Sequence, residues 1–409
     1  MHPSDSIRGT RSTLLKGKRI VVGVSGSIAA VEMVRVIREL LRHGADVVAV
    51  ASHEATRILS AEALEFATGE PVVTELTGRV EHVVLFTPGP EKADLLLLAP
   101  ATANTLSKVA HGIDDTPVTT CASMALGNGV PVVVAPAMHR AMTQNPFVAE
   151  SLRRLEKAGV SLIPPVEEEG EAKLATPEVV AAHVLHRLAA GPWAGKRVLV
   201  IGGSTSEPID EVRAITNGGS GRLAVEIAAH AYYRGADVTL WMGERKVPVP
   251  AFIPTTRFRT VGDLQKLLTS QATLVKRTDV VIVPAAISDF TVRDGKKGKI
   301  SSETTATLEI PLARAAKILP KIRAMVRART RLVGFKLEAG ASGPQLLERA
   351  KARMKEERLD AIVANTVESM GGEETSLHVI REGRDTVDLK GKKTQVAGAL
   401  LDVLGDGLP

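Results

Sequence analysis

Short apolar runs recur along the chain, and each is followed by a turn of small residues and then by an amphipathic stretch. The first run is Arg19–Val24, and residues 28–42 after it show the spacing of a helix that ends before Gly44. Strand-length apolar runs that alternate with helical stretches are typical of parallel sheets with crossover helices. We therefore expect an α/β fold. Further strands in the first half are predicted at residues 47–50, 95–99 and 130–135.

The same alternation restarts after a short joint at residues 191–195, and two domains fit a length of 409 residues. We predict a flexible lead-in over residues 1–18, a first domain over 19–190 and a second over 191–409. Both are expected to be Rossmann-like, the first flavodoxin-like with helices on both faces of a parallel sheet. In the second domain, strands are predicted at 197–201, 238–241, 280–283, 332–335 and 361–364, helices at 221–234 and 396–404, and a terminal β-hairpin at 377–380 and 386–389.

Charge and cysteine content narrow the function classes. The net charge of +6 fits either a solvated basic surface or an anionic ligand. Nucleic acid is disfavoured because the sequence lacks an aromatic-rich RNA motif, a zinc knuckle and a basic-region helix, and phosphorylated small molecules fit at least as well. Cys121 is the single cysteine, which excludes an internal disulfide and suits a reducing cytoplasm. No apolar run reaches the ~20 residues of a membrane-spanning helix.

The turn Ser25-Gly26-Ser27 follows the first predicted strand and opens a helix. Small residues let backbone N–H groups approach a phosphate at a helix N-terminus, although a plain tight turn would look similar. The turn is not a GxGxxG sequence and no acidic ribose partner follows it, which argues against NAD. Ligands of parallel sheets lie at the carboxyl ends of strands. The other segments to consider are therefore Ser52, residues 99–105 and residues 136–142.

These segments, together with residues 81–83, resemble the flavin-containing cysteine decarboxylases over about residues 18–190. The resemblance implies FMN as cofactor, bound between subunits of a homo-oligomer. It also implies that the flavin oxidises the substrate thiol so that the neighbouring carboxyl group can leave as carbon dioxide, and then returns the electrons. The residues implied to bind the cofactor are Ser25, Gly26, Ser27, Ser52, Thr102, Ala103, Asn104, Thr105 and Ser123.

Three residues of the first half are predicted to act in catalysis. His82 matches the family's active-site histidine, although a lone histidine is more often structural; its side chain can move a proton near neutral pH. His139 stands where bacterial members carry an asparagine that holds the substrate carboxylate. The flap at residues 169–173 lacks the family's proton-donating cysteine. We hypothesise that Lys173 donates the proton instead, against the alternative of an ordinary surface lysine.

The second half carries four constellations that point to phosphate chemistry. Residues 202–222 read as an anion-binding loop before a helix, and residues 284–290 place Asp289 at a strand end, where it could bind Mg²⁺ or a ribose. Residues 296–300, including Lys296 and Lys297, form a basic, glycine-containing stretch that could close over phosphates or simply be a solvated charge run. The fourth constellation combines residues 333–335 with 360–365.

Together these segments resemble phosphopantothenate–cysteine ligase over about residues 195–405. The resemblance implies activation of a carboxylate by CTP as an acyl-cytidylate, with Mg²⁺ at Asp289, followed by attack of the cysteine amine. Asn217 and Lys299 are the implied catalytic residues. Glu357 and Ser301–Ser302 depart from the family pattern. The choice between CTP and ATP as the nucleotide substrate therefore stays open. The residues implied to bind substrates are Arg213, Ala285, Asp289, Ala316, Lys317, Ile318, Leu319, Phe335 and Arg353.

The two resemblances imply consecutive steps of coenzyme A biosynthesis, because the product of the ligase is the substrate of the decarboxylase. A non-catalytic flavin-binding regulatory protein is the alternative for the first half, and retention of His82 speaks against it. A prenyl-transferring relative of the same fold is disfavoured by the attached ligase half. The predicted partners are therefore small molecules (4'-phosphopantothenate, cysteine and CTP) and further copies of the chain.

Overall fold

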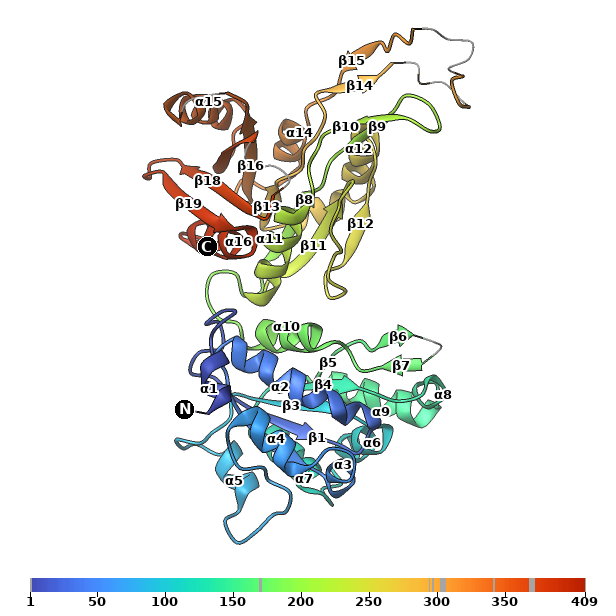
Figure 1. Ribbon diagram of the computed structural model, residues 1–409, viewed down its shortest axis with the longest axis vertical. Coiled ribbons are helices and arrows are strands. Elements are labelled where there is room, and N and C mark those ends of the chain that lie inside the picture. The colour runs from blue at the N-terminus through green and yellow to red at the C-terminus, as the bar shows by residue number, and fades with distance from the viewer. Residues whose placement is uncertain are drawn as a thin grey trace. The chain divides into compact units, whose positions relative to one another are not determined.

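The computed structural model describes residues 2–168, 171–293, 295, 298–301, 307–340, 343–367 and 372–408. The chain divides into two compact units, residues 1–189 and 190–409 (Figure 1). Each unit is built on its own predominantly parallel sheet, as the alternation of apolar runs and helical stretches predicts. None of the helices in the described part of the chain is long and apolar enough to span a bilayer.

The sheet of the N-terminal unit has five parallel strands in the order β2-β1-β3-β4-β5. Its central strands are buried on both faces, which explains their continuous Val and Leu runs. The strands are β1 (Arg19–Val24), β2 (Asp46–Ala51), β3 (Leu95–Ala101), β4 (Val132–Pro136) and β5 (Ser161–Leu162), and β6 (Val166–Glu168) pairs with β7 (Glu171–Lys173) in a separate hairpin.

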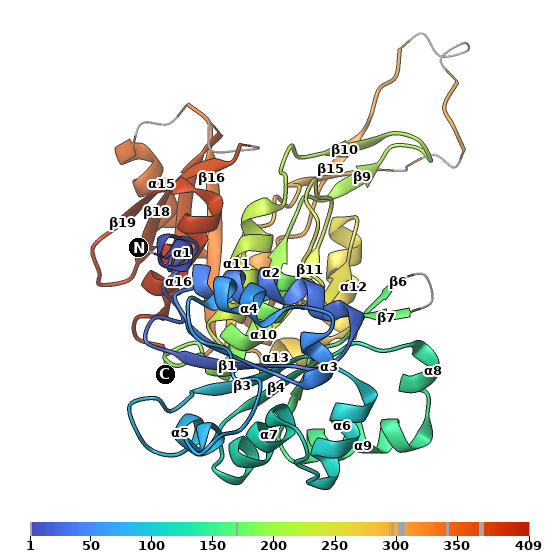
Figure 2. The ribbon, with the colours of Figure 1, turned by 60° about the horizontal axis from the view of Figure 1, so that its bottom comes forward.

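Helices lie on both faces of this sheet, as predicted (Figure 2). Helices α2 (Met33–Arg42) and α10 (Pro177–Leu188) cover one face, and α6 (Ala103–His111), α7 (Pro117–Gly127) and α9 (Pro146–Lys157) the other. The remaining helical segments of this unit are α1 (Pro3–Ile7), η1 (Ile28–Glu32), α3 (His53–Thr56), α4 (Ala61–Thr68), α5 (Glu81–Phe86) and α8 (Arg140–Thr143).

Two features of the N-terminal unit differ from the sequence pattern. The helix expected over residues 28–42 begins as the 3₁₀ segment η1 and becomes α-helical only at Met33. The first residues, expected to form a flexible lead-in, are folded. Leu15 is 1% exposed, and the backbone N–H groups of Arg11 and Ser12 donate to the carbonyl of Arg42. Burial of an apolar side chain and pairing of backbone groups offset the entropy of ordering this segment.

The sheet of the C-terminal unit has eight strands in the order β12-β11-β8-β13-β16-β17-β18-β19. The last pair forms the predicted antiparallel terminal hairpin. The strands of this unit are β8 (Arg197–Gly202), β11 (Asp237–Met242), β12 (Thr255–Arg257), β13 (Val280–Val283), β16 (Arg331–Glu338), β17 (Ala361–Thr366), β18 (Glu374–Arg381) and β19 (Val387–Lys392), with β9 (Ser206–Pro208), β10 (Ala214–Thr216), β14 (Phe290–Val292) and β15 (Leu312–Arg314) outside the main sheet.

Each face of this sheet has its own apolar core. Helices α11 (Arg222–Tyr233) and α16 (Lys393–Gly405) pack on one face. The other face is covered by α12 (Val261–Ser270), α13 (Ala272–Arg277), α14 (Ile318–Met325) and α15 (Gly343–Glu356). The strand pairs β9–β10 and β14–β15 extend beside each other away from the main sheet, as a two-ribbon arm (Figures 1 and 2).

Candidate active sites

The strand order of the N-terminal unit creates a ligand crevice at the carboxyl ends of β1 and β3. The chain leaves β1 toward β2 on one side and later returns to β3 on the other, and flavodoxin-like sheets of this order bind FMN at this point. Ser25 holds the two strand ends together. Its Oγ donates to the carbonyl of Pro100 at 2.7 Å and accepts from the N–H of Thr102 at 3.1 Å. The hydroxyl hydrogen of Ser25 is therefore used within the crevice wall, so it is not available to donate to a phosphate.

Three other predicted residues cap the helical segments that begin at the crevice. The Oγ atoms of Ser27 and Ser52 accept from the N–H groups of Ala29 and Ala55, which leaves each hydroxyl hydrogen as a donor. Thr102 also caps α6, but its hydroxyl donates to Oγ1 of Thr105 at 3.1 Å. Hydroxyls and helix N-termini at one sheet edge form a donor set that suits the phosphate of a flavin nucleotide. The residues present thus fit the predicted cofactor.

Gly26 lets the first turn approach the segment after β2. A Cβ atom on Gly26 would lie 2.4 Å from Cβ of Glu54 in α3. In α6, Ala103 and Thr105 are buried and Asn104 is exposed. Ser123 is exposed on α7, and no hydrogen bond in the described part of the chain links it to the crevice. The glycine is therefore required by packing, while Ser123 stays a prediction.

A cleft of about 670 Å³ adjoins the crevice, within the 300–1,000 Å³ range of small-molecule sites. Its lining includes Ser27, His139 and Lys173, which come from the first turn, the segment after β4 and the end of β7. The structure thus brings together the predicted phosphate, carboxylate and proton-donor positions. Residues 169 and 170 of the flap lie outside the described residues.

His82 lies away from this cleft, on α5. The carbonyl of Leu85 in this helix accepts from the N–H of Ala93, two residues before β3 begins. Helix α5 is consequently at the amino ends of the strands, whereas α3 and α6 are at the carboxyl ends (Figures 1 and 2). Nδ1 of His82 is buried without a hydrogen-bond partner in the described structure. One copy of the unit therefore does not bring His82 to its own flavin crevice.

In the C-terminal unit, a cavity of about 490 Å³ lies at the carboxyl ends of β13 and β16. Strand ends and the N-terminus of α14 form its wall, and Phe335 presents an aromatic ring to it. The cavity brings together the predicted catalytic residue Asn217 and eight of the nine predicted substrate-binding residues: Ala285, Asp289, Ala316, Lys317, Ile318, Leu319, Phe335 and Arg353.

Charged pairs line this cavity. Lys317 Nζ lies 2.7 Å from Oδ1 of Asp289, and Arg353 Nε lies 3.1 Å from Oε2 of Glu357. The hydrogen bond from Lys317 is the main reason why the pKa of Asp289 is lowered. No cluster of three or more metal-ligating side chains occurs among the residues described. Mg²⁺ at Asp289 would thus need phosphate and water ligands, as is usual for this ion.

Asn217 Nδ2 donates to the carbonyl of Ala286 at 3.0 Å, which orients the amide at the cavity mouth. Arg213 and Lys299 lie instead at the two-ribbon arm. The buried carboxylate of Asp210 accepts from Arg213 NH1 at 2.7 Å and from the N–H of Ile300, next to Lys299, at 3.1 Å. The pKa of Asp210 is about 2, because these and two further hydrogen bonds outweigh desolvation. Lys296, Lys297 and Ser302 lie outside the described residues.

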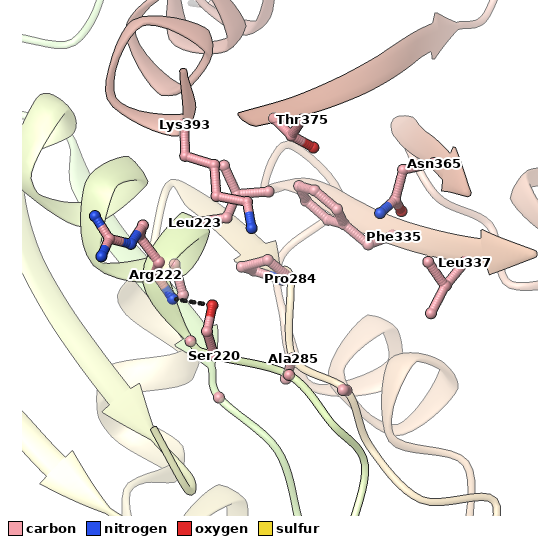
Figure 3. Close-up of a pocket in the computed structure, with 15 residues that line it drawn as sticks. Ser220, Arg222, Leu223, Pro284, Ala285, Phe335, Leu337, Asn365, Thr375 and Lys393 are labelled. Atoms are coloured by element: carbon pink, nitrogen blue, oxygen red, sulfur yellow. Dashed lines mark hydrogen bonds between the residues drawn. The ribbon is translucent and has the colours of Figure 1, made fainter. Parts of the chain in front are cut away.

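Figure 3 shows a smaller cavity next to the first one. The two share part of their lining, including Ala285 and Phe335. Thr375 of β18 and Lys393 of α16 complete the lining of the smaller cavity. The sequence motifs predict no role for either residue. They lie far along the chain from the motifs and belong to no recognisable pattern, so only the fold reveals them.

Protein-family models match both halves: residues 8–189 match the flavoprotein family, and residues 193–407 the C-terminal domain of DNA/pantothenate metabolism flavoproteins. The chain is 44% identical over 386 residues to the coenzyme A biosynthesis bifunctional protein CoaBC of Thermococcus kodakarensis, covering 94% of each chain. It is 35% identical over 407 residues to the protein of that name from Methanocaldococcus jannaschii, covering 98% of this chain and 97% of that one. The crystal structure of the DNA/pantothenate metabolism flavoprotein from Streptococcus pneumoniae aligns with a TM-score of 0.46 and 23% identity, over 52% of this chain and 99% of that chain. The chain therefore belongs to the family of bifunctional coenzyme A biosynthesis proteins.

Proposed function

We propose that the cleft of the N-terminal unit decarboxylates phosphopantothenoylcysteine with FMN, and that the cavity of the C-terminal unit makes this substrate from 4'-phosphopantothenate, cysteine and CTP. Membership of the family makes the chain a bifunctional enzyme of coenzyme A biosynthesis, a decarboxylase joined to a ligase. The observation that supports the division of labour is that each unit has a cavity at the carboxyl ends of its own sheet. A non-catalytic regulatory role is not favoured.

In the decarboxylase, the hydroxyls of Ser27 and Ser52 and the N-terminus of α6 would hold the FMN phosphate. Bound FMN supplies reversible oxidation of the substrate thiol, which creates the electron sink that loss of carbon dioxide requires. His139, exposed at the cleft, would bind the substrate carboxylate through an imidazole N–H until the carboxylate leaves. Lys173 would give a proton to carbon at the end of the cycle.

The position of His82 supports the proposal of a homo-oligomer. Its orphaned Nδ1 lies at the opposite sheet edge from the crevice of the same chain. An active site that contains both His82 and FMN therefore needs two copies, with α5 of one facing the crevice of the other. This arrangement supports the prediction that FMN lies between subunits.

In the ligase, Asn217 would hold the acyl-cytidylate, and Arg353, Phe335 and the start of α14 would contact CTP. Asp289 would hold Mg²⁺ once Lys317 releases its carboxylate, and the ion would supply positive charge to the nucleotide phosphates. Lys299 would neutralise charge during attack by the cysteine amine, which requires the two-ribbon arm to reach a cavity. All of these contacts serve to convert a carboxylate, a poor acyl donor, into a mixed anhydride. We expect the reaction to take place in the cytoplasm.

Incubation of the yellow full-length protein with 4'-phosphopantothenate, cysteine, Mg²⁺ and either CTP or ATP tests this function. Mass spectrometry should show 4'-phosphopantetheine with CTP. Phosphopantothenoylcysteine without further conversion would limit the chain to ligation, and product with ATP alone would overturn the assignment of CTP.

Lys173→Ala tests the proton donor, and Lys157→Ala, an exposed lysine of α9, is the matched control. Lys173→Ala should slow formation of 4'-phosphopantetheine about 100-fold, the lower end for loss of a general acid, while carbon dioxide is still released in the first turnover because that step precedes the protonation. Full turnover to 4'-phosphopantetheine by Lys173→Ala would refute this role.

A further inference from the structure

A buried carboxylate links the two ribbons of the arm (Figure 1). Asp210 lies in the turn between β9 and β10, and its side chain is 0% exposed. Oδ1 accepts from the N–H groups of Val212 and Arg213, at 2.8 and 2.6 Å, within the turn itself. Oδ2 accepts from Arg213 Nη1 at 2.7 Å and from the N–H of Ile300, in the segment between β14 and β15, at 3.1 Å. The carboxylate therefore joins the turn of one ribbon to the connecting segment of the other.

Further contacts hold the same segment against the turn. The N–H of Glu211 donates to the carbonyl of Gly298 at 3.4 Å, and Arg213 Nη1 donates to the carbonyl of Ile300 at 3.1 Å. Closer to β14, a Cβ atom on Gly295 would lie 3.3 Å from the carbonyl oxygen at the end of β9. The segment thus meets the first ribbon at residues 295, 298 and 300.

Lys299 lies between two of these contacts. Its neighbours Gly298 and Ile300 are half-buried and hydrogen-bonded to the turn, whereas Lys299 itself is exposed. The backbone on both sides of Lys299 is therefore fixed while its side chain points away from the turn. Fixing the backbone in advance reduces the entropy that is lost when the ammonium group binds its ligand.

The same carboxylate orients Arg213. In the described structure, both hydrogen bonds of this guanidinium to other residues use Nη1, so Nε and Nη2 remain for a ligand. The side chain is 38% exposed. Arg213 and Lys299 are the two predicted ligase residues that do not line the larger cavity. Asp210 thus aligns both of these cations from one position.

Burial of Asp210 indicates that the position of the Lys299 segment matters. A basic surface loop stays solvated without an anchor, and removal of a carboxylate from water is unfavourable unless the carboxylate is paired and hydrogen-bonded. Here four N–H donors, one of them from a guanidinium, offset the desolvation. These contacts favour an ordered role for the segment over the alternative of a solvated charge run.

We propose that Asp210 is a positioning residue of the ligase, which fixes the backbone on both sides of Lys299 so that the arm presents this ammonium group, together with Arg213, in one arrangement. The proposal rests on the ligase function and deepens it, because Lys299 is the residue proposed to neutralise charge during attack by the cysteine amine. Asp210 lines neither of the two cavities described for this unit. It therefore acts through its neighbours.

Limited proteolysis of the full-length protein tests this arrangement without any substrate. Trypsin can cut after Lys299 only when the contacts of Ile300 open, so the rate of this cut follows the open population. Asp210→Asn leaves one acceptor oxygen for four N–H donors. It should raise the rate about 10- to 100-fold, the value of a hydrogen bond to a charged group. Glu211→Gln, at the exposed neighbouring position, is the matched control and should be cut as slowly as wild type. Mass spectrometry identifies the cut.

Ligation kinetics test whether the arrangement serves Lys299. Asp210→Asn should slow formation of phosphopantothenoylcysteine about 10- to 100-fold at saturating substrates, because the same interaction is lost. In protein that already carries Lys299→Ala, Asp210→Asn should have a much smaller effect, since residues that act as a unit are not additive. Binding of CTP, measured by titration calorimetry, should stay near wild type in Asp210→Asn, which shows that the unit is folded.

The outcomes separate this proposal from the proposed function. The proposal fails if the cut after Lys299 is as slow in Asp210→Asn as in Glu211→Gln, or if Asp210→Asn slows ligation by the same factor with and without Lys299. Loss of CTP binding in Asp210→Asn would also refute it, because Asp210 would then support the cavity itself. Wild-type protein that forms no phosphopantothenoylcysteine with CTP or ATP would instead refute the ligase function.

Discussion

The C-terminal unit gathers nine predicted ligase residues, eight for substrate binding and the catalytic Asn217, around one cavity, whereas the N-terminal unit leaves His82 at one edge of its sheet and the flavin crevice at the other. Both units were expected to place their sites at the carboxyl ends of strands. Seven of the nine follow strands or stand at the start of α14, while Phe335 lies within β16 and Arg353 in the last turn of α15. His82 belongs to a helix that leads into a strand from its other end.

This difference has a geometric cause. Helix α5 ends close to the first residue of β3, a strand of seven residues, which spans roughly 23 Å at ~3.3 Å per residue. A side chain on α5 is therefore about a strand length from the crevice of its own copy. The ligase can assemble most of its cavity within one chain, while the proposed decarboxylase site, if it includes His82, takes that residue from a second chain.

The strongest test of this comparison combines two inactive variants. His82→Ala should reduce carbon dioxide release at least about 100-fold, a typical loss for a proton-transfer group, and His139→Ala about 10- to 100-fold, the value of a hydrogen bond to a charged group. Co-expression of the two should restore part of the activity, because some sites then combine an intact α5 from one copy with an intact cleft from another. Carbon dioxide release from phosphopantothenoylcysteine is the measurement.

Ligation by the two variants is the internal control, because neither residue belongs to the C-terminal unit. Mixed oligomers that stay as inactive as the parents would show that His82 and His139 act in the same copy, or that His82 has only a structural role. In that case the contrast between a ligase site within one chain and a decarboxylase site between two chains would be wrong.

A smaller effect is expected from Gly26→Ala. The added Cβ would lie 2.4 Å from Cβ of Glu54, so α3 must move, at a typical cost of about 1–3 kcal/mol. The protein should fold but bind FMN more weakly, as flavin absorbance after dialysis would show. Gly127→Ala, where the added Cβ meets nothing within 4 Å, should bind FMN normally. Equal flavin content in the two variants would contradict the close packing of the first turn.

The sequence pattern predicts the sheets better than the sites. Strands β1 and β13 begin and end where their apolar runs do, because buried parallel strands have a continuous apolar signature. The burial of Lys393 could not be predicted from the sequence, because it depends on the packing of α16 against α11, about 170 residues away along the chain. The remoteness of His82 escaped it too, because a matching motif carries no information about which sheet edge a helix occupies.

In each sheet, an aspartate accepts hydrogen bonds at the amino ends of the strands. The two aspartates, Asp94 and Asp279, differ in how many hydrogen bonds they accept. Asp94 accepts from Lys18 Nζ and the N–H of Arg19, both at 2.9 Å. Asp279 accepts from the N–H and the guanidinium of Arg197 and from Arg327. Burial alone would raise the pKa of Asp279, but these hydrogen bonds and charges lower it to about 2.

Asp279→Asn should therefore lower the free energy of unfolding by at most about 2.5 kcal/mol at pH 7, because the pKa falls from 3.8 to about 2 at ~1.4 kcal/mol per unit. Because the folded-state pKa is depressed, this contribution is present above pH 4 and is lost as the pH falls toward 2. Denaturant unfolding of wild type and variant across this range is the measurement, and Asp94→Asn should have the smaller effect. A difference independent of pH would mean that the carboxylate charge is not the cause.

The smallest effect on decarboxylation is expected from substitution of Cys121, the single cysteine of the chain. The thiol is fully buried in α7, and burial, with the charge of Glu81 second, raises its pKa to about 12. Almost no thiolate therefore exists at neutral pH, and the thiolate is the reactive form. Cys121→Ser should leave the rate of carbon dioxide release unchanged, and wild-type protein should resist iodoacetamide at pH 7 until it is unfolded. A variant that loses decarboxylation while it still binds FMN would make Cys121, in place of Lys173, the candidate proton donor.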